Sequence, residues 1–274
     1  MKKGKFFVVG TGPGGPDQTT LEALRCIETA DLILCPEETK TRFASYIGGK
    51  PVYCNPWEGL FDYKGKPWRE LVHSDPSLIE TFKKERIRIR EEIVGYVKEQ
   101  MATGKNVALI ENGDPCLFGP SHWFIEGFEA DEVEILPGVG TFSVAMAALK
   151  KSSIPAYDTR FVMQTSPFFL TENDQDDDIF RDLSKYPATM VFYMALWNLE
   201  NLIKRLTEQY PENLPVAVIY HLGHDEKQHI VQGTLKTIVE KVRDIKEDFA
   251  GLIIVGKCLE GAGYRNKTEN LVRV

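Results

Sequence analysis

Two glycine-containing loops, each placed directly after a short apolar run, constrain the fold of this chain more than any other feature. The run 6–9 leads into the loop 10–17, and the run 107–110 leads into the loop 111–119. An apolar run without alternation is typical of a strand buried on both faces, as in a parallel sheet. Glycine at the end of such a strand lets backbone approach a ligand closely. Two such loops on one sheet predict a ligand crevice at its edge.

Length and composition favour a globular protein with a sizeable core. With 274 residues, of which 43% are apolar and 27% charged, the chain can form one large or two medium domains. A formal net charge of −7 argues against a nucleic-acid partner, because proteins that bind nucleic acids normally carry a basic face. We therefore expect neither a nucleic-acid nor a membrane partner.

Cysteine usage and the N-terminus indicate a reducing compartment. The five cysteines are odd in number, form no C-x-x-C pair and fit no zinc spacing, which favours buried free thiols. The apolar run before Gly10 is too short for a signal-peptide core, and no stretch approaches the ~20 apolar residues of a membrane span. We expect a cytoplasmic protein.

The first half of the chain predicts a parallel sheet covered by helices. Thr19 or Thr20 can cap a helix with one apolar face, and a strand follows at Leu32–Leu34. This strand–helix–strand order is typical of a parallel sheet. Further strands are expected at 107–110 and 133–136, and helices at 79–101 and 142–149. Within the first of these helices, the mixed charges of 83–92 predict a solvated face. The aromatic, glycine- and proline-containing segment 55–75 is expected to be an ordered loop or insertion.

Pro155 interrupts the helical pattern and marks the expected domain boundary, which gives domains 1–155 and 156–274. The second half predicts strands at 161–163, 190–194, 216–220, 230–235 and 252–255, the fourth of them at an edge, and helices at 199–206 and 237–245. The acidic run 171–178 lacks the glycine and the distal glutamate of a calcium-binding EF-hand loop. It predicts a solvated loop or a helix N-terminus.

The first loop satisfies the dinucleotide fingerprint G-x-G-x-x-G literally, which leaves a nicotinamide-dependent oxidoreductase open. Two features weaken this interpretation. Pro13 removes a backbone donor that a phosphate cradle would use. The acid that holds a ribose usually ends the next strand, whereas Asp31 begins it here.

Asp114 and a group of histidines are the other candidate functional residues. A carboxylate just past a strand can accept hydrogen bonds from a ligand or face a cation, although an aspartate before proline also forms ordinary turns. His221, His224 and His229 lie close in sequence, but no neighbouring cysteine or acid array completes a clear metal site. We expect no metal.

Five segments, taken in order, resemble the tetrapyrrole (corrin/porphyrin) methylase family. They are 9–14 with Thr20-Leu21 and Ala30-Asp31; Gly113-Asp114-Pro115 with Phe118-Gly119; Pro137-Gly138-Val139 with Ile154-Pro155; Tyr193-Met194; and Pro215-Val216-Ala217 with Gln228 and 233–235. Each segment is modest alone, and the shared order over nearly the whole chain makes the resemblance specific.

The resemblance implies two α/β domains with mixed, largely parallel sheets and S-adenosylmethionine bound in a cleft between them, in a homodimer. Carried over by position, the cofactor contacts are Pro13, Gly113, Asp114, Leu117, Gly140, Thr141, Met194, Ala195 and Gly223. Leu117 and Met194 can supply the apolar slot that an adenine needs. Asn112 and the pair Gly140-Thr141 depart from the family pattern, and 55–75 departs in length and aromatic content.

The activity implied by the resemblance is transfer of a methyl group to a carbon of a reduced tetrapyrrole, of the precorrin, cobalt-precorrin or uroporphyrinogen type. The sequence identifies no general base for it. The residues that could meet acceptor carboxylates are Lys40, Arg42, Lys150, Lys151 and Arg160. Alternatives are a protein or RNA acceptor with the same fold and cofactor, as in relatives resembling diphthine synthase or the rRNA ribose methylases, and a binding module without catalysis.

Overall fold

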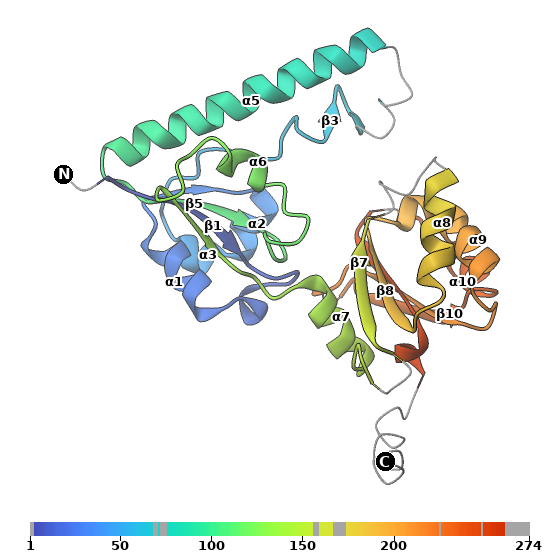
Figure 1. Ribbon diagram of the computed structural model, residues 1–274. Coiled ribbons are helices and arrows are strands. Elements are labelled where there is room, and N and C mark those ends of the chain that lie inside the picture. Colours follow the sequence, from blue (N-terminus) through green and yellow to red (C-terminus); the bar gives the residue numbers. More distant parts are fainter. Residues whose placement is uncertain are drawn as a thin grey trace. The chain divides into compact units, whose positions relative to one another are not determined.

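The computed structural model describes residues 3–67, 71, 76–155, 159–166, 174–224, 226–247 and 249–260. Its contacts divide the chain into two compact units, Met1–Gly140 and Thr141–Val274 (Figure 1). This division lies before the boundary expected at residue 155. Helix α7 (Thr141–Leu149) belongs with the second unit because Ala145, Met146 and Leu149 pack against side chains of that unit's sheet.

The first unit contains a four-stranded parallel sheet. Its strands are β1 (Phe6–Gly10), β2 (Leu32–Leu34), β5 (Val107–Glu111) and β6 (Val133–Leu136), in the order β2-β5-β1-β6. Every pairing among them is parallel, as the unbroken apolar runs predict. The carboxyl ends of β1, β5 and β6 therefore lie along one edge of the sheet, and the segments that follow them share that edge.

Helices cover both faces of this sheet (Figure 1). On one face, α1 (Leu21–Thr29) and α3 (Ala44–Ile47) provide apolar cover, for example Ile27 and Ile47, and α2 (Glu37–Arg42) leads into α3 through the buried Phe43. On the other face lie α5 (Pro76–Ala102) and α6 (His122–Ile125). The N-cap of α1 is Thr20, whose Oγ1 accepts a hydrogen bond from the Ala23 N–H at 3.2 Å, as the capping pattern predicts. A short 3₁₀ turn, Pro16–Gln18, precedes this cap.

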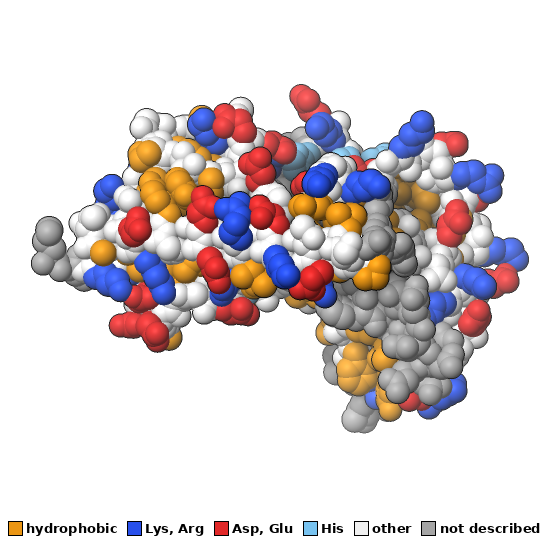
Figure 2. Space-filling view, turned by 90° about the horizontal axis from the view of Figure 1, so that it is seen from above, with side chains coloured by type: hydrophobic (Ala, Val, Ile, Leu, Met, Phe, Trp, Pro, Cys, Tyr) orange, Lys and Arg blue, Asp and Glu red, His pale blue; other side chains and the backbone are white. Residues whose placement is uncertain are grey.

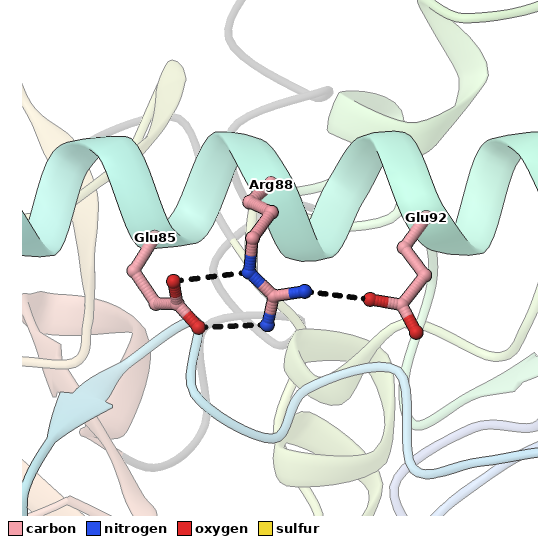
Figure 3. A network of polar contacts seen from close by, with 3 residues as sticks. All are labelled: Glu85, Arg88 and Glu92. Carbon is pink, nitrogen blue, oxygen red and sulfur yellow. Dashed lines mark hydrogen bonds and ion pairs between the residues drawn. The ribbon is translucent and has the colours of Figure 1, made fainter.

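Helix α5 carries the mixed charges on its solvent side. Arg88 donates hydrogen bonds to Glu85 at 2.8 and 3.1 Å and to Glu92 at 2.9 Å, which makes a ladder along the helix (Figure 3). Acidic and basic side chains are likewise interspersed over the face of the molecule shown in Figure 2. These contacts agree with the solvated helix face expected for 83–92, whereas Arg86 and Arg90 of the same run are partly buried against Trp123.

The aromatic segment packs onto the first unit as an ordered insertion. Its described part contains a two-residue-strand hairpin, β3 (Asp62–Tyr63) and β4 (Lys66–Pro67). The Trp57 ring lies 5.9 Å from that of Phe124 on α6, and the Tyr63 ring lies 5.7 Å from that of Phe82 on α5. Residues 68–70 and 72–75 of the segment lie outside the described residues.

The second unit contains a five-stranded mixed sheet. Its strands are β7 (Phe161–Thr165), β8 (Ala188–Tyr193), β9 (Pro215–Tyr220), β10 (His229–Thr234) and β11 (Gly251–Val255), in the order β10-β9-β11-β8-β7. Only β7 and β8 pair in parallel, and the other three pairings are antiparallel. The two α/β units are thus confirmed, although the largely parallel character belongs to the first unit alone. Strand β10 lies at an edge, as predicted.

Helices again pack on both faces of the second sheet. One face holds α8 (Asp174–Leu183), α9 (Leu199–Gln209) and α10 (Ile238–Val242), and the other holds α7 and the 3₁₀ turn Lys257–Leu259. A second 3₁₀ turn, Leu196–Asn198, links β8 to α9. Part of the acidic run 171–178 lies outside the described residues, and the remainder begins α8 at Asp174. That position agrees with the helix N-terminus considered from the sequence.

Two global expectations concern membranes and thiols. In the described part of the chain, no helix combines the length and the apolar character that a membrane crossing requires. All five cysteines are free, but only Cys35 and Cys258 are buried. The expectation of buried thiols is therefore wrong for Cys116, which is exposed because it lies in the loop after β5.

Candidate functional site

Three loops converge at the carboxyl edge of the first sheet. They follow β1, β5 and β6, and they touch through glycines. A β-carbon added to Gly10 would overlap Pro115 and the backbone of Gly138, and one added to Gly138 would overlap the carbonyl oxygen of Gly113. The close approach of these backbones explains why glycine occupies all three loops.

Backbone hydrogen bonds join the first two loops. The Thr11 N–H donates to the Glu111 carbonyl at 3.0 Å, and Gly12 and Gly113 exchange N–H···O bonds of 3.0 and 2.8 Å. Both glycines adopt positive φ, +73° and +80°, which residues with a side chain rarely adopt. The loops are therefore held as one rigid unit before any ligand arrives.

The structure brings together four of the sequence-predicted residues at this edge. Pro13, Asp114 and Leu117 are partly buried, whereas Gly113 is buried. The Asp114 Oδ1 atom accepts a hydrogen bond from the Cys116 N–H at 3.0 Å. Asp114 thus forms the turn that the sequence suggested as the ordinary alternative, and its carboxylate stays at the mouth of the loop.

The remaining predicted residue of the first unit, Gly140, ends the loop after β6. A β-carbon built there meets no atom within 4 Å, which distinguishes it from the tightly packed Gly138. Thr141 follows it directly as the first residue of α7 in the second unit. The two residues are consecutive in the chain and join the two units.

Glu111 is a candidate that sequence reasoning missed. It ends β5 and is only 4% exposed, and in the described part of the chain its Oε2 has no hydrogen-bond partner. Burial, with a smaller contribution from the Asp114 carboxylate, raises the pKa of Glu111 to about 7, against an opposing effect of Ser121. An acid ending an otherwise apolar strand was the available signal.

The second unit gathers the other predicted residues at one edge of its own sheet. Tyr193, the last residue of β8, pairs with Leu252, and Tyr220, the last residue of β9, pairs with Gly251. The segments that begin at Met194 and His221 therefore both start beside the N-terminus of β11. Ala195 is fully buried, while Met194 and Gly223 are partly buried.

Two residues at this edge of the second sheet have a strained, left-handed backbone conformation. Met194 has φ +52° and His221 has φ +48°, a conformation that residues other than glycine, asparagine and aspartate seldom adopt. Phe118, in the loop after β5, is a third case at φ +57°. Such strain persists only where surrounding contacts enforce it, and it is found preferentially at functional sites.

His221 makes a well-defined polar contact at this edge. Its Nε2 lies 3.0 Å from the Oε2 of Glu247, in the segment that leads into β11. The other carboxylate oxygen of Glu247 accepts hydrogen bonds from the N–H groups of Phe249 and Ala250, both at 2.8 Å. Sequence reasoning did not pair these two residues, because they are distant in the chain.

The histidines do not converge as metal ligands would. His221 faces Glu247, whereas the ring of His229 lies 6.4 Å from that of Tyr220 at the start of β10. Within the ranges that the structure describes, no three His, Cys, Asp or Glu side chains form a group that could hold a metal ion.

The basic candidates for acceptor carboxylates are dispersed. Arg42 pairs with Glu38 at 2.7 Å and reaches the Gly14 carbonyl at 3.5 Å, so it borders the first loop. Lys40 pairs with Glu37 at 3.1 Å. In the second unit Lys151 donates to the Glu260 carbonyl at 3.2 Å, Lys150 follows the end of α7, and Arg160 is exposed before β7. Arg42 alone among them is seen to contact a candidate loop.

Comparison with known proteins places this geometry in context. Residues 5–239 match the model of the family described as tetrapyrrole (corrin/porphyrin) methylases. A cobalt-precorrin-4 C(11)-methyltransferase of Methanocaldococcus jannaschii is 31% identical over 95% of this chain and 90% of its own length. A uroporphyrinogen-III C-methyltransferase of the same organism is 30% identical over 93% of this chain and 96% of its own length.

Solved structures share the fold. A cobalt-precorrin-4 methyltransferase of cobalamin biosynthesis superposes with a TM-score of 0.71 at 22% identity, covering 93% of this chain and 96% of its own. A uroporphyrin-III C-methyltransferase from Thermus thermophilus, solved as a complex with S-adenosylhomocysteine, gives a TM-score of 0.62 at 19% identity over 93% and 99% of the two chains. At these identities the likeness extends to the fold alone.

Proposed function

The chain belongs to the tetrapyrrole (corrin/porphyrin) methylase family, and from this premise we propose that it transfers the methyl group of S-adenosylmethionine to a carbon of a reduced tetrapyrrole. The family match across residues 5–239 carries this proposal. Two curated relatives at 31% and 30% identity are named as C-methyltransferases acting on tetrapyrroles, and each aligns along nearly its whole length.

The residues at the two loop edges suit S-adenosylmethionine. In the first unit Pro13, Gly113, Asp114, Leu117 and Gly140 would contact it, and in the second unit Thr141, Met194, Ala195 and Gly223. The rigid glycine loops would offer backbone N–H and C=O groups, and the Asp114 carboxylate would accept hydrogen bonds from polar groups of the ligand. Leu117 and Met194 would supply apolar contacts.

The bound cofactor supplies a methyl group that its sulfonium sulfur already activates for displacement. The protein has mainly to hold the acceptor carbon in line with that group, which can remove several kcal/mol from the barrier. No metal is required for this step.

The acceptor class follows from the names of the relatives. We propose a tetrapyrrole of the cobalt-precorrin-4 or uroporphyrinogen III type, one of whose acid side chains would meet Arg42 beside the first loop. The family assignment displaces the nicotinamide interpretation of 10–15.

We further propose that the protein works in the cytoplasm as a homodimer. Light scattering tests the dimer by its mass, and a monomer mass would contradict it.

Calorimetric titration with S-adenosylhomocysteine, with NADH as the control, tests the cofactor. Micromolar binding of the first alone is expected, and binding of NADH alone would overturn the proposal. Turnover is then measured with uroporphyrinogen III and cobalt-precorrin-4 separately, by the S-adenosylhomocysteine formed. Methylation of neither acceptor by protein that binds S-adenosylhomocysteine would favour a protein or RNA acceptor.

A further inference from the structure

A carbon acceptor that gains a methyl group must lose a proton, and the geometry of the second unit provides a group to take it. His221 begins the segment after β9 that also contains Gly223, and its side chain is 30% exposed. It is therefore open to a ligand at this edge while its backbone is fixed. The His221 N–H donates to the Ala250 carbonyl at 2.8 Å, which helps to hold the residue at its positive φ of +48°.

Glu247 orients the ring of His221. The Oε1 atom of Glu247 is occupied by the Phe249 and Ala250 N–H groups, which leaves Oε2 to face the Nε2 of His221 at 3.0 Å. A carboxylate in that position favours a proton on Nε2, since an unprotonated Nε2 would face it lone pair to lone pair. The ring then presents Nδ1 on its opposite side as the basic nitrogen.

The surroundings of the pair support this arrangement. Burial, with a smaller effect of the Glu247 charge, raises the pKa of Tyr220 to about 12, so this neighbour stays neutral. A groove of about 410 Å³ is lined by Trp197, Tyr220 and Glu247 among others. Trp197 in turn donates from Nε1 to the Met194 carbonyl at 2.8 Å. The dyad thus adjoins the segment that contains the predicted contacts Met194 and Ala195.

We propose that His221 accepts the proton released from the tetrapyrrole during methyl transfer, and that Glu247 is its positioning residue. The inference rests on the proposed function. The acceptor carbon forms a bond to the methyl carbon while the methyl–sulfur bond breaks and leaves its electron pair on sulfur. The acceptor then carries one additional positive charge, and it loses a proton to Nδ1 of His221. The imidazolium beside Glu247 later releases that proton to water, so one proton is produced for each methyl group transferred.

Glu247→Gln tests this role directly, because the two carboxylate oxygens of Glu247 have different partners. The amide oxygen can keep the Phe249 and Ala250 N–H groups, and the amide NH₂ then faces Nε2 of His221. That donor requires a lone pair on Nε2 and moves the proton to Nδ1, where it blocks the basic nitrogen. Imidazole ¹⁵N NMR reads this tautomer without any turnover. We expect protonated Nε2 in the wild type and protonated Nδ1 in the variant.

Kinetics supply the second readout. Loss of a general base typically lowers a rate by about 10²- to 10⁴-fold, so Glu247→Gln is expected to lower kcat at least ~100-fold and leave the affinity for S-adenosylhomocysteine within about threefold. His221→Asn is expected to do the same, because asparagine tolerates the left-handed backbone at that position. Added imidazole should partly restore the kcat of His221→Asn. His229→Asn is the matched control, expected to retain wild-type kcat.

The outcomes separate this inference from the proposed function. If the wild type methylates its acceptor and either His221→Asn or Glu247→Gln keeps kcat within threefold of the wild-type value, the role of the dyad is overturned and the proposed function stands. A wild-type His221 protonated on Nδ1 would also overturn it, as would a His221→Asn variant that has lost S-adenosylhomocysteine binding. Wild-type protein that binds no S-adenosylhomocysteine would overturn the proposed function and this inference with it.

Discussion

Gly10 and Gly138 approach each other so closely that a β-carbon on Gly10 would overlap the backbone of Gly138. One ends β1 and the other follows β6, so the contact ties together two strands that neighbour each other in the sheet. Gly138 also lies against Gly113, which connects the loop after β5 to the same cluster. The candidate site of the first unit is therefore built from backbone packed on backbone, and its shape depends on the absence of side chains.

Gly138→Ala tests that dependence. The added methyl group overlaps the Gly113 carbonyl, and overpacking of this kind typically costs about 1–3 kcal/mol. We expect a loss of about 2 kcal/mol in the free energy of unfolding by urea denaturation, together with weaker S-adenosylhomocysteine binding. Gly95→Ala is the control. Gly95 lies at an exposed position of helix α5, where a β-carbon meets nothing within 4 Å, and the change should stabilise the protein by up to about 1 kcal/mol. Equal stabilities of the two variants would contradict the packing described.

Asp114→Ala tests the carboxylate at the mouth of the loop after β5. A hydrogen bond to a charged group contributes about 1.5–3 kcal/mol, so S-adenosylhomocysteine affinity should fall at least tenfold in calorimetry. Asp114→Asn separates charge from local structure, because its amide oxygen can still accept the Cys116 N–H. We expect Asp114→Asn to keep wild-type stability and still to bind more weakly. Unchanged affinity in both variants would remove Asp114 from the site.

Met194→Asp tests the second unit. Met194 has φ +52°, which aspartate tolerates, so the backbone can remain in place while a charge enters an apolar contact surface. S-adenosylhomocysteine should bind at least ~10-fold more weakly, because a charge is costly to desolvate against an apolar ligand group. Met194→Asn is the neutral counterpart of similar shape and should lose less affinity. Wild-type affinity in Met194→Asp would mean that this segment does not contact the cofactor.

Glu111 predicts a pH dependence of stability. Its pKa is raised to about 7 in the folded protein from an ordinary 4.5. The folded state thus binds its proton more tightly than the unfolded state does, and stability should fall as pH rises from about 4.5 to 7. The full shift corresponds to an upper limit of about 3.5 kcal/mol at about 1.4 kcal/mol per pKa unit.

Glu111→Gln removes the titration, and its urea-unfolding free energy should be less dependent on pH between 5 and 8 than that of the wild type. The variant should exceed the wild type in stability at pH 8, where burying the charged carboxylate costs most. Parallel stability curves for the two proteins across this pH range would show that Glu111 does not titrate as described. Ser121→Ala, measured alongside, removes the hydroxyl that lowers the pKa of Glu111, so its fall in stability is expected to extend to higher pH than in the wild type.

Local sequence patterns predicted much of the fold, because the pattern of a buried strand or an amphipathic helix is formed by residues close together in the sequence. The runs before Gly10 and before Glu111 predicted β1 and β5. The pair Thr19 and Thr20 predicted the start of α1, and the structure identifies Thr20 as the cap. The short helices α2 and α6 were not predicted, because they carry no such local pattern. Helix α2 is a charged six-residue segment without apolar periodicity, and α6 has four residues. Helix α6 is held by packing through Phe124, and α2 is held through its contacts with α3.

The loop chemistry and the family could be predicted from the sequence, because glycine and aspartate at strand ends act through their own backbone and side-chain geometry. Which residues become partners depends on the packing of distant segments. The antiparallel pairings of β11 with β8 and β9 bring Met194, His221 and Glu247 to one edge, although the three come from separate segments. Likewise, the fold buries Glu111 under its own loop beside Ser121. Burial and long-range contact depend on how distant segments pack, and that information is absent from any single stretch of the chain.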